Sequence, residues 1–291
     1  MEPAVDAIST AAAYFNVIRM TGFDRSLPYG EEVWEIVRMD GAGGRQFFQL
    51  LDRCTNIFQD MTVGELKARV RATGALGKAT QVRVDDLVGR AFAQRYLIDG
   101  GKPAQWLRNL LLKRVSRGLL RQLILIYTAR ANLILHDFIR EVFWLKYSSP
   151  TGEVTKQDAR DFIDRAVNRG ALEKRWSESM VERVTRYLLG TLADFELIAS
   201  NHFGKRQIRP LFIMPETIVF LAYEMHFAGI EDQDIVRCRD WALFGLLPAD
   251  VIASLEKAAT QGHIFIQHSG ALVRVEWKYQ NMEDMLDALT Q

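Results

Sequence analysis

The stretch "RWSESMVERVTRYLLGTLADFELIASNHFGKRQIRPLFI" (residues 175–213) decides the fold, because it joins a long helical pattern to a short irregular one. In its first part, apolar residues recur at three- and four-residue intervals, and Ser179 followed by Glu182 resembles a capping box that opens a helix. Residues 199–213 contain a glycine and are too irregular for a helix. We therefore predict a helix followed by a short two-stranded turn.

The C-terminal region repeats this order. Residues 248–262 begin with Pro248 and end with Gly262, which is typical of a bracketed helix. In residues 263–277 apolar residues alternate with charged ones after the turn signal Ser269–Gly270, which predicts a β-hairpin. A helix that runs into a hairpin, twice in one chain, is typical of winged helix-turn-helix units.

The rest of the chain is dominated by helical spacing, for example in residues 31–39, 45–61 and 84–98. Thr155 followed by Asp158 predicts a capped helix, and Pro215 and Gly229 bracket another. We predict a mainly α protein with winged helix-turn-helix-like units and short β-hairpins. Its expected regions are an N-terminal helical unit (1–100), a central helical and winged-helix-like region (101–229), and C-terminal helices with a β-hairpin (230–291).

The composition is that of an ordinary soluble globular protein. The 291 residues are 48% hydrophobic and 25% charged, and no apolar run approaches the length of a membrane span. Two cysteines, Cys54 and Cys238, are too few for a disulfide framework and favour reduced thiols. There is no signal-peptide pattern at the N-terminus. We therefore expect a cytoplasmic location.

The charge of the chain is balanced overall but not locally. There are 37 Lys and Arg residues against 36 Asp and Glu residues, yet residues 101–136 carry seven basic residues and no acidic one. When residues 108–124 are placed on one helix, Lys113, Arg114, Arg117 and Arg121 fall within an arc of about 100°. This pattern predicts one wholly cationic helix face.

Three interpretations of that face remain open from the sequence. It can bind phosphates, or it can be solvated or neutralised by acidic residues from another segment. A helix on a membrane surface is the third interpretation, and it is weakened because the face has no flanking aromatic cluster beyond Trp106.

A second basic group belongs to residues 175–213. Arg183 and Arg186 lie on the polar side of its helix, and "GKRQIR" (204–209) places further cations at the expected hairpin. In winged-helix proteins, the helix before the wing enters the major groove and the wing touches the backbone or the minor groove; the alternative is a helix that only packs the core. The predicted DNA-binding residues are Arg108, Lys113, Arg114, Arg117, Arg121, Arg183, Arg186, Lys205, Arg206 and Arg209.

Motifs for catalysis are missing from the sequence. "GALGKAT" (74–80) has the wrong spacing for a phosphate-binding P-loop, and there is no H-E-x-x-H or G-x-S-x-G pattern. His263 and His268 lack a companion cluster of Cys or carboxylate ligands. We therefore expect no enzymatic activity, no catalytic residue, no metal and no cofactor.

Four blocks of the sequence resemble the BrxA family of bacteriophage exclusion (BREX) systems, over about residues 105–277. They are "ARANLILHDFIREVFWLKYSSPTGEVTKQDARDFI" (129–163), "RWSESMVERVTRYLLGTLADFELIA" (175–199), "KRQIRPLFIMPETIVFLAYEMHFAGI" (205–230) and "ASLEKAATQGHIFIQHSGALVRVEW" (253–277). The resemblance implies a helical protein similar to the antitermination factor NusB, with winged-helix character. It also implies binding to double-stranded DNA, beside a methyltransferase and an ATPase of the defence system.

The residues and the resemblance together predict a non-enzymatic, DNA-binding accessory protein of phage defence that contacts mainly phosphates. Two other functions stay open. One is RNA binding, which the NusB-like character suggests, although aromatic residues are not interleaved with the basic ones. The other is a protein adaptor whose cationic face docks on an acidic partner of the defence complex.

Overall fold

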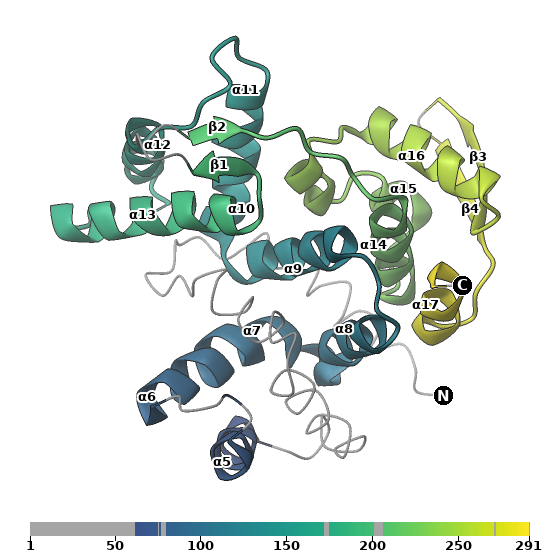
Figure 1. Ribbon diagram of the computed structural model, residues 1–291. Coiled ribbons are helices and arrows are strands. Elements are labelled where there is room, and N and C mark those ends of the chain that lie inside the picture. Colours follow the sequence, from purple (N-terminus) through teal and green to yellow (C-terminus); the bar gives the residue numbers. More distant parts are fainter. Residues whose placement is uncertain are drawn as a thin grey trace.

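The computed structural model describes residues 62–74, 76, 80–171, 175–200, 206–270 and 272–290 (Figure 1). The helices expected at 31–39 and 45–61, and the predicted contact residue Lys205, lie outside the described residues. The architecture is mainly helical, with two short antiparallel hairpins, as the sequence predicts.

The described chain begins with a helical layer. It comprises α5 (Val63–Thr73), α6 (Gln81–Val84), the π-helical η2 (Asp85–Phe92), α7 (Ala93–Tyr96), the short η3 (Asp99–Gly101) and α8 (Lys102–Leu112). Thr62 and Glu65 form a capping box that starts α5, and Thr80 caps α6. The helix expected over 84–98 corresponds to η2 and α7.

Helix α9 (Arg117–Ala131) lies at the centre of the molecule. After a break at Asn132, the chain continues through α10 (Leu133–Phe138), η4 (Ile139–Phe143) and α11 (Trp144–Tyr147). The last of these helices ends at Tyr147. Residues 152–154 then pair along a strand, because Val154 N–H donates to the Arg206 carbonyl and Ile208 N–H donates to the Gly152 carbonyl.

Two helices and a hairpin follow these paired residues. They are α12 (Lys156–Asn168), α13 (Glu178–Asp194), β1 (Ile198–Ser200) and β2 (Arg206–Ile208), with Ile198 paired to Ile208. The capping box of Thr155 and Asp158 is confirmed at the start of α12. The expected start of α13 at Ser179 is wrong by two residues, because Ser177 is the residue before the helix.

The C-terminal elements cover one side of the centre (Figure 1). The bracketed helices are confirmed as α14 (Pro215–Phe227) and α16 (Pro248–Thr260), and the hairpin as β3 (Ile264–Ser269) with β4 (Leu272–Trp277). Between and after them lie α15 (Asp232–Ile235), the 3-10 turn η5 (Arg239–Phe244) and α17 (Met282–Leu289).

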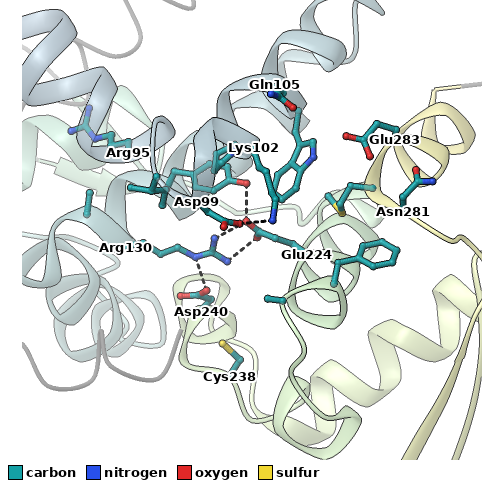
Figure 2. Close-up of a pocket in the computed structure, with 18 of the residues that line it drawn as sticks. Arg95, Asp99, Lys102, Gln105, Arg130, Glu224, Cys238, Asp240, Asn281 and Glu283 are labelled. Atoms are coloured by element: carbon teal, nitrogen blue, oxygen red, sulfur yellow. Dashed lines mark hydrogen bonds and ion pairs between the residues drawn. The ribbon is translucent and has the colours of Figure 1, made fainter. Parts of the chain in front are cut away.

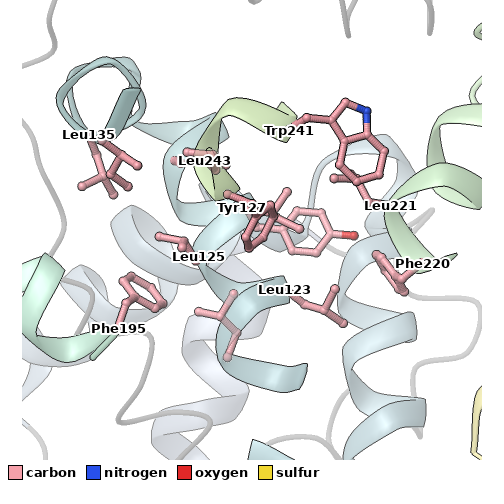
Figure 3. Packing of buried hydrophobic residues seen from close by; sticks show 14 of the residues in the cluster. Leu123, Leu125, Tyr127, Leu135, Phe195, Phe220, Leu221, Trp241 and Leu243 are labelled. Carbon is pink, nitrogen blue, oxygen red and sulfur yellow. The ribbon is translucent and has the colours of Figure 1, made fainter. Parts of the chain in front are cut away.

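The core forms around α9 and α14. Every residue of α14 from Thr217 to Met225 is buried, which is the pattern of a helix surrounded by protein on all sides. Figure 3 shows side chains of α9 such as Leu123 and Tyr127 together with Phe220 of α14 and Trp241 of η5. One continuous apolar cluster runs from α5 to α17, so the hydrophobic effect stabilises the described elements together.

The single helix expected over residues 108–124 is wrong. Helix α8 ends at Leu112, and α9 begins only at Arg117. Between them Arg114 adopts a left-handed backbone with φ of 56°, and Ser116 caps α9 by accepting a hydrogen bond from Leu119 N–H. The strong cap at Ser116 therefore starts a new helix and divides the cationic face.

Among the residues that the structure describes, no helix combines the length and the apolar character needed to cross a bilayer.

Candidate functional site

The structure places the predicted DNA-binding residues in two groups. Arg108 lies on α8, Lys113 and Arg114 on the α8–α9 turn, and Arg117 and Arg121 on α9. The second group comprises Arg183 and Arg186 of α13 with Arg206 and Arg209 at β2.

The first group, which we call the α8–α9 cations, is partly neutralised within the protein. The Lys113 ammonium donates to the Asp287 carboxylate of α17 and to the hydroxyl of Thr290, which follows that helix. The Arg121 guanidinium binds the Glu196 carboxylate through two hydrogen bonds of 2.6 and 2.7 Å. Acidic residues from distant segments therefore meet two positions of this face, which is one of the alternatives that the sequence left open.

Glu196 joins the two groups. It follows α13 in a left-handed conformation with φ of 56°, and its carboxylate also lies 4.0 Å from the Arg209 guanidinium. Arg121 and Arg209 thus converge on one carboxylate, although they lie 88 positions apart in the sequence. The C-terminal end of α13 is held to α9 at this point.

The outward face of α13, formed by Ser179, Arg183, Arg186 and Gly190, has a different character. At 100° per residue these four positions form one stripe, and the first three are exposed. Neither arginine forms an ion pair with any described residue, although the Arg183 guanidinium lies 5.5 Å from the centre of the Tyr187 ring. Two arginines beside a glycine give a narrow cationic ridge with room for a backbone or groove to approach.

The two glutamates near the start of α13 are bound by the neighbouring helix α12. The Arg160 guanidinium bridges Glu178 and Glu182, with N–O distances of 2.5 and 2.8 Å, and Lys156 lies 3.4 Å from Glu182. The hydrogen bond from Arg160 lowers the pKa of Glu182 below its ordinary value. The two glutamates in the first turns of α13 are therefore compensated by α12, and Arg183 and Arg186 remain the charged residues of the outward stripe.

Figure 1 shows how these elements are arranged. The N-terminal end of α13 points away from the rest of the described chain, with α12 beside it and the β1–β2 hairpin at its C-terminal end. Arg206 lies on β2, and Arg209 follows it after three residues. The hairpin is tied to the loop before α12 by a hydrogen bond from the Gln207 amide to Glu153.

The sequence did not reveal the buried ion network at the end of α9. The Arg130 guanidinium binds both oxygens of Glu224 at 2.9 Å and the Asp240 carboxylate at 2.8 Å. The Tyr127 hydroxyl donates to Glu224 at 2.8 Å. Glu224 and Asp240 are 4% and 3% exposed, so one more cation of the basic segment is used inside the protein.

Next to this network lies a cavity of about 720 Å³ between α8, α9, α14 and the start of α17 (Figure 2). Cys238 lines it, and burial raises the pKa of the Cys238 thiol to about 12, so the thiol is protonated and not nucleophilic at neutral pH. Within the described ranges no group of three His, Cys, Asp or Glu side chains could hold a metal ion.

Comparison with known proteins supplies the family. The family model described as BrxA matches residues 55–224, which are 170 of the 291 residues of the chain. No curated protein and no solved structure gives a match. The matched range includes α12, α13 and the β1–β2 hairpin, and most of the segment with the sequence resemblance. The chain therefore belongs to the BrxA family, whose membership links it to bacteriophage exclusion.

Proposed function

We propose that this protein is a non-enzymatic accessory factor of bacteriophage exclusion that binds double-stranded DNA through α13 and the β1–β2 hairpin. The observation that carries the proposal is the charge arrangement of α13. Its glutamates are bound by α12, while Arg183 and Arg186 form no ion pair with a described residue on its outward face. Phosphates are the partners that such exposed arginines attract most strongly.

The order of the elements supports the same function. The helical segment 133–147, the paired residues 152–154, α12, α13 and the β1–β2 hairpin follow one another as in a winged helix-turn-helix unit. In that arrangement α13 takes the place of the recognition helix, and the hairpin takes the place of the wing. Because Arg183 and Arg186 are the only charged residues among the four outward positions, we expect mainly phosphate contacts and weak sequence preference.

The α8–α9 cations contribute less in this proposal. Lys113 and Arg121 must leave Asp287 and Glu196 before they can bind a phosphate, and that exchange offsets the gain in free energy. Arg209 and Arg206 extend the cationic ridge from α13 along β2. Five to eight neutralised phosphates correspond to a slope of roughly −4 to −7 for the logarithm of affinity against the logarithm of salt concentration.

The test is fluorescence anisotropy of a labelled 30-base-pair duplex with the full chain across a salt series. The variant Arg183→Glu/Arg186→Glu should bind at least about 30-fold more weakly than wild type, since two favourable phosphate contacts become repulsive. The matched control is Arg237→Glu/Arg274→Glu, which makes the same charge change at two exposed positions of the C-terminal region. The control should lose less than about threefold.

Three outcomes would contradict the proposal or change its partner. Equal losses in both double variants would mean that only net charge matters. Stronger competition by duplex RNA than by duplex DNA would favour the RNA-binding alternative. If wild type binds no duplex at low salt, the cationic ridge is better explained as a docking face for an acidic protein, such as the methyltransferase or the ATPase of the defence system.

A further inference from the structure

The first turns of α13 carry two acidic residues that would oppose DNA binding if their charges were free. Glu178 and Glu182 lie four positions apart, so their carboxylates are neighbours on one helix and repel each other. Glu182 also lies four positions before Arg186, which is the spacing and the order that favour an ion pair along a helix. By local sequence alone, Glu182 is therefore placed to neutralise one arginine of the proposed DNA contact.

The structure directs both carboxylates to α12 instead. The Arg160 guanidinium donates through Nη1 to Glu178 at 2.5 Å and through Nη2 to Glu182 at 2.8 Å. The Lys156 ammonium donates to the other oxygen of Glu182 at 3.4 Å. Both oxygens of Glu182 are thus bound by a neighbouring helix, and α12 lies beside α13 in Figure 1.

The geometry explains why α12, and not Arg186, binds Glu182. A guanidinium offers several donors in one plane, so Arg160 binds two carboxylates at once and offsets their mutual repulsion. The Arg160 and Glu182 side chains are 29% and 36% exposed, so solvent screens this pair less than a contact with the exposed Arg186. The hydrogen bond from Arg160, followed by that from Lys156, holds the pKa of Glu182 below its ordinary value.

We propose that Lys156 and Arg160 are positioning residues for the DNA contact, an inference that rests on the proposed binding through α13. They raise DNA affinity without touching a phosphate, because they keep Glu182 from pairing with Arg186. Helix α12 presents them from a fixed position, since a capping box starts the helix at Thr155.

The test measures fluorescence anisotropy of the labelled 30-base-pair duplex with the full chain. Lys156→Gln/Arg160→Gln should bind about three- to tenfold more weakly than wild type, because the freed glutamates repel phosphates and Glu182 pairs with Arg186. Adding Glu178→Gln and Glu182→Gln to this variant restores the net charge of wild type. The resulting rescue variant should bind within about twofold of wild type, although it has lost every one of these ion pairs.

The matched control adds Glu256→Gln and Glu276→Gln to Lys156→Gln/Arg160→Gln instead. It has the same net charge as the rescue variant, but both substitutions are at exposed positions of the C-terminal elements, which lie across the described chain from α13 (Figure 1). Charges that far apart are screened by salt, so the control should stay at least about threefold weaker than wild type.

Salt dependence separates a positioning role from a direct contact. The rescue variant should keep the logarithmic salt slope of wild type within about 0.5, whereas the loss of two phosphate contacts would reduce its magnitude by about 2. Glu182→Gln in the otherwise unchanged chain should raise the affinity less than about twofold, because its charge is already bound by α12.

Four outcomes would overturn the proposal. Equal affinities of the rescue variant and its control would mean that only net charge matters. A reduced slope of the rescue variant would mean that the α12 cations contact phosphates themselves. A larger gain from Glu182→Gln alone would mean that α12 does not mask this charge. If Lys156→Gln/Arg160→Gln binds as wild type does while Arg183→Glu/Arg186→Glu loses binding, this inference fails and the proposed function stands.

Discussion

The segment 101–136 and helix α13 both attract notice for their arginines, but the fold uses those arginines differently. In the first segment Lys113 is bound by Asp287, Arg121 by Glu196, and Arg130 by Glu224 and Asp240. All four carboxylates come from segments later in the chain. In α13, by contrast, the nearest carboxylates belong to the helix itself and are bound by cations of α12.

This difference shows that local density of charge does not measure how much charge is available to a partner. A segment without acidic residues creates a strong positive potential, and during folding that potential is compensated by carboxylates elsewhere in the chain. A helix of mixed sequence can be more cationic on one face when a neighbouring helix binds its acids, as Lys156 and Arg160 of α12 bind Glu178 and Glu182. We therefore place the nucleic-acid contact on α13.

The largest expected effect is on stability, and it concerns Arg130, the buried cation of residues 101–136. Arg130→Met should lower the free energy of unfolding by about 3–5 kcal/mol, since it leaves the carboxylates of Glu224 and Asp240 buried without their cation. Denaturant unfolding measures the loss. Arg114→Met, at an exposed position of the same segment, should cost less than about 0.5 kcal/mol. Similar costs for both variants would mean that the network contributes nothing to stability.

The next effect concerns the exposed arginines of α13 and is measured as the salt dependence of DNA affinity. Arg183→Gln/Arg186→Gln should reduce the magnitude of the logarithmic salt slope of DNA binding by about 2, because each lost phosphate contact contributes about 0.9. Lys113→Gln should change the slope by less than about 0.5, since Lys113 is engaged by α17. If Lys113→Gln reduced the slope more than Arg183→Gln/Arg186→Gln, the DNA would contact the α8–α9 cations and not α13.

A smaller effect concerns the helix that compensates the acids of α13. Partial burial raises the pKa of Asp158, but the Lys146 ion pair and the Thr155 hydrogen bonds outweigh it and lower the pKa below the ordinary value of 3.8. Asp158→Asn should cost about 1 kcal/mol at pH 7. The carboxylate contributes stability above its unfolded-state pKa, so the difference between wild type and variant should vanish as the pH falls through the lower folded-state pKa.

Unfolding followed from pH 7 down to pH 3 checks this sign. Asp164→Asn on the same helix, at a side chain that is 56% exposed, should cost less than about 0.5 kcal/mol. A cost of Asp158→Asn that stays constant with pH would mean that the carboxylate charge is not what stabilises the start of α12.

Much of the fold could be predicted from local signals. Thr155 and Asp158 form their capping box, and Pro215 and Pro248 begin their helices, because caps and proline act through neighbouring backbone atoms. The break before α9 shows the limit of periodicity. The apolar and basic spacing continues through residues 113–116, while the left-handed Arg114 and the Ser116 cap interrupt the backbone.

The candidate site could be predicted only in part. Arg183 and Arg186 follow from helical spacing within α13, but their freedom from acidic partners depends on Arg160, which is 23 positions before Arg183. The partners of Lys113 and Arg130 lie about 90 to 170 positions away, and no local pattern records such pairs.

The smallest expected effect has the opposite sign to all the others. Glu196→Gln removes the carboxylate on which Arg121 and Arg209 converge, so the negative charge beside the exposed Arg209 is lost, and DNA affinity should rise about two- to fivefold at low salt. Glutamine keeps the side-chain length, and it tolerates the left-handed backbone at this position as glutamate does. The control Glu256→Gln removes an equal charge from α16, where the carboxylate binds His268, and should change the affinity less. If Glu196→Gln binds no more tightly than this control, Arg209 does not reach the DNA, and the contact surface ends with α13.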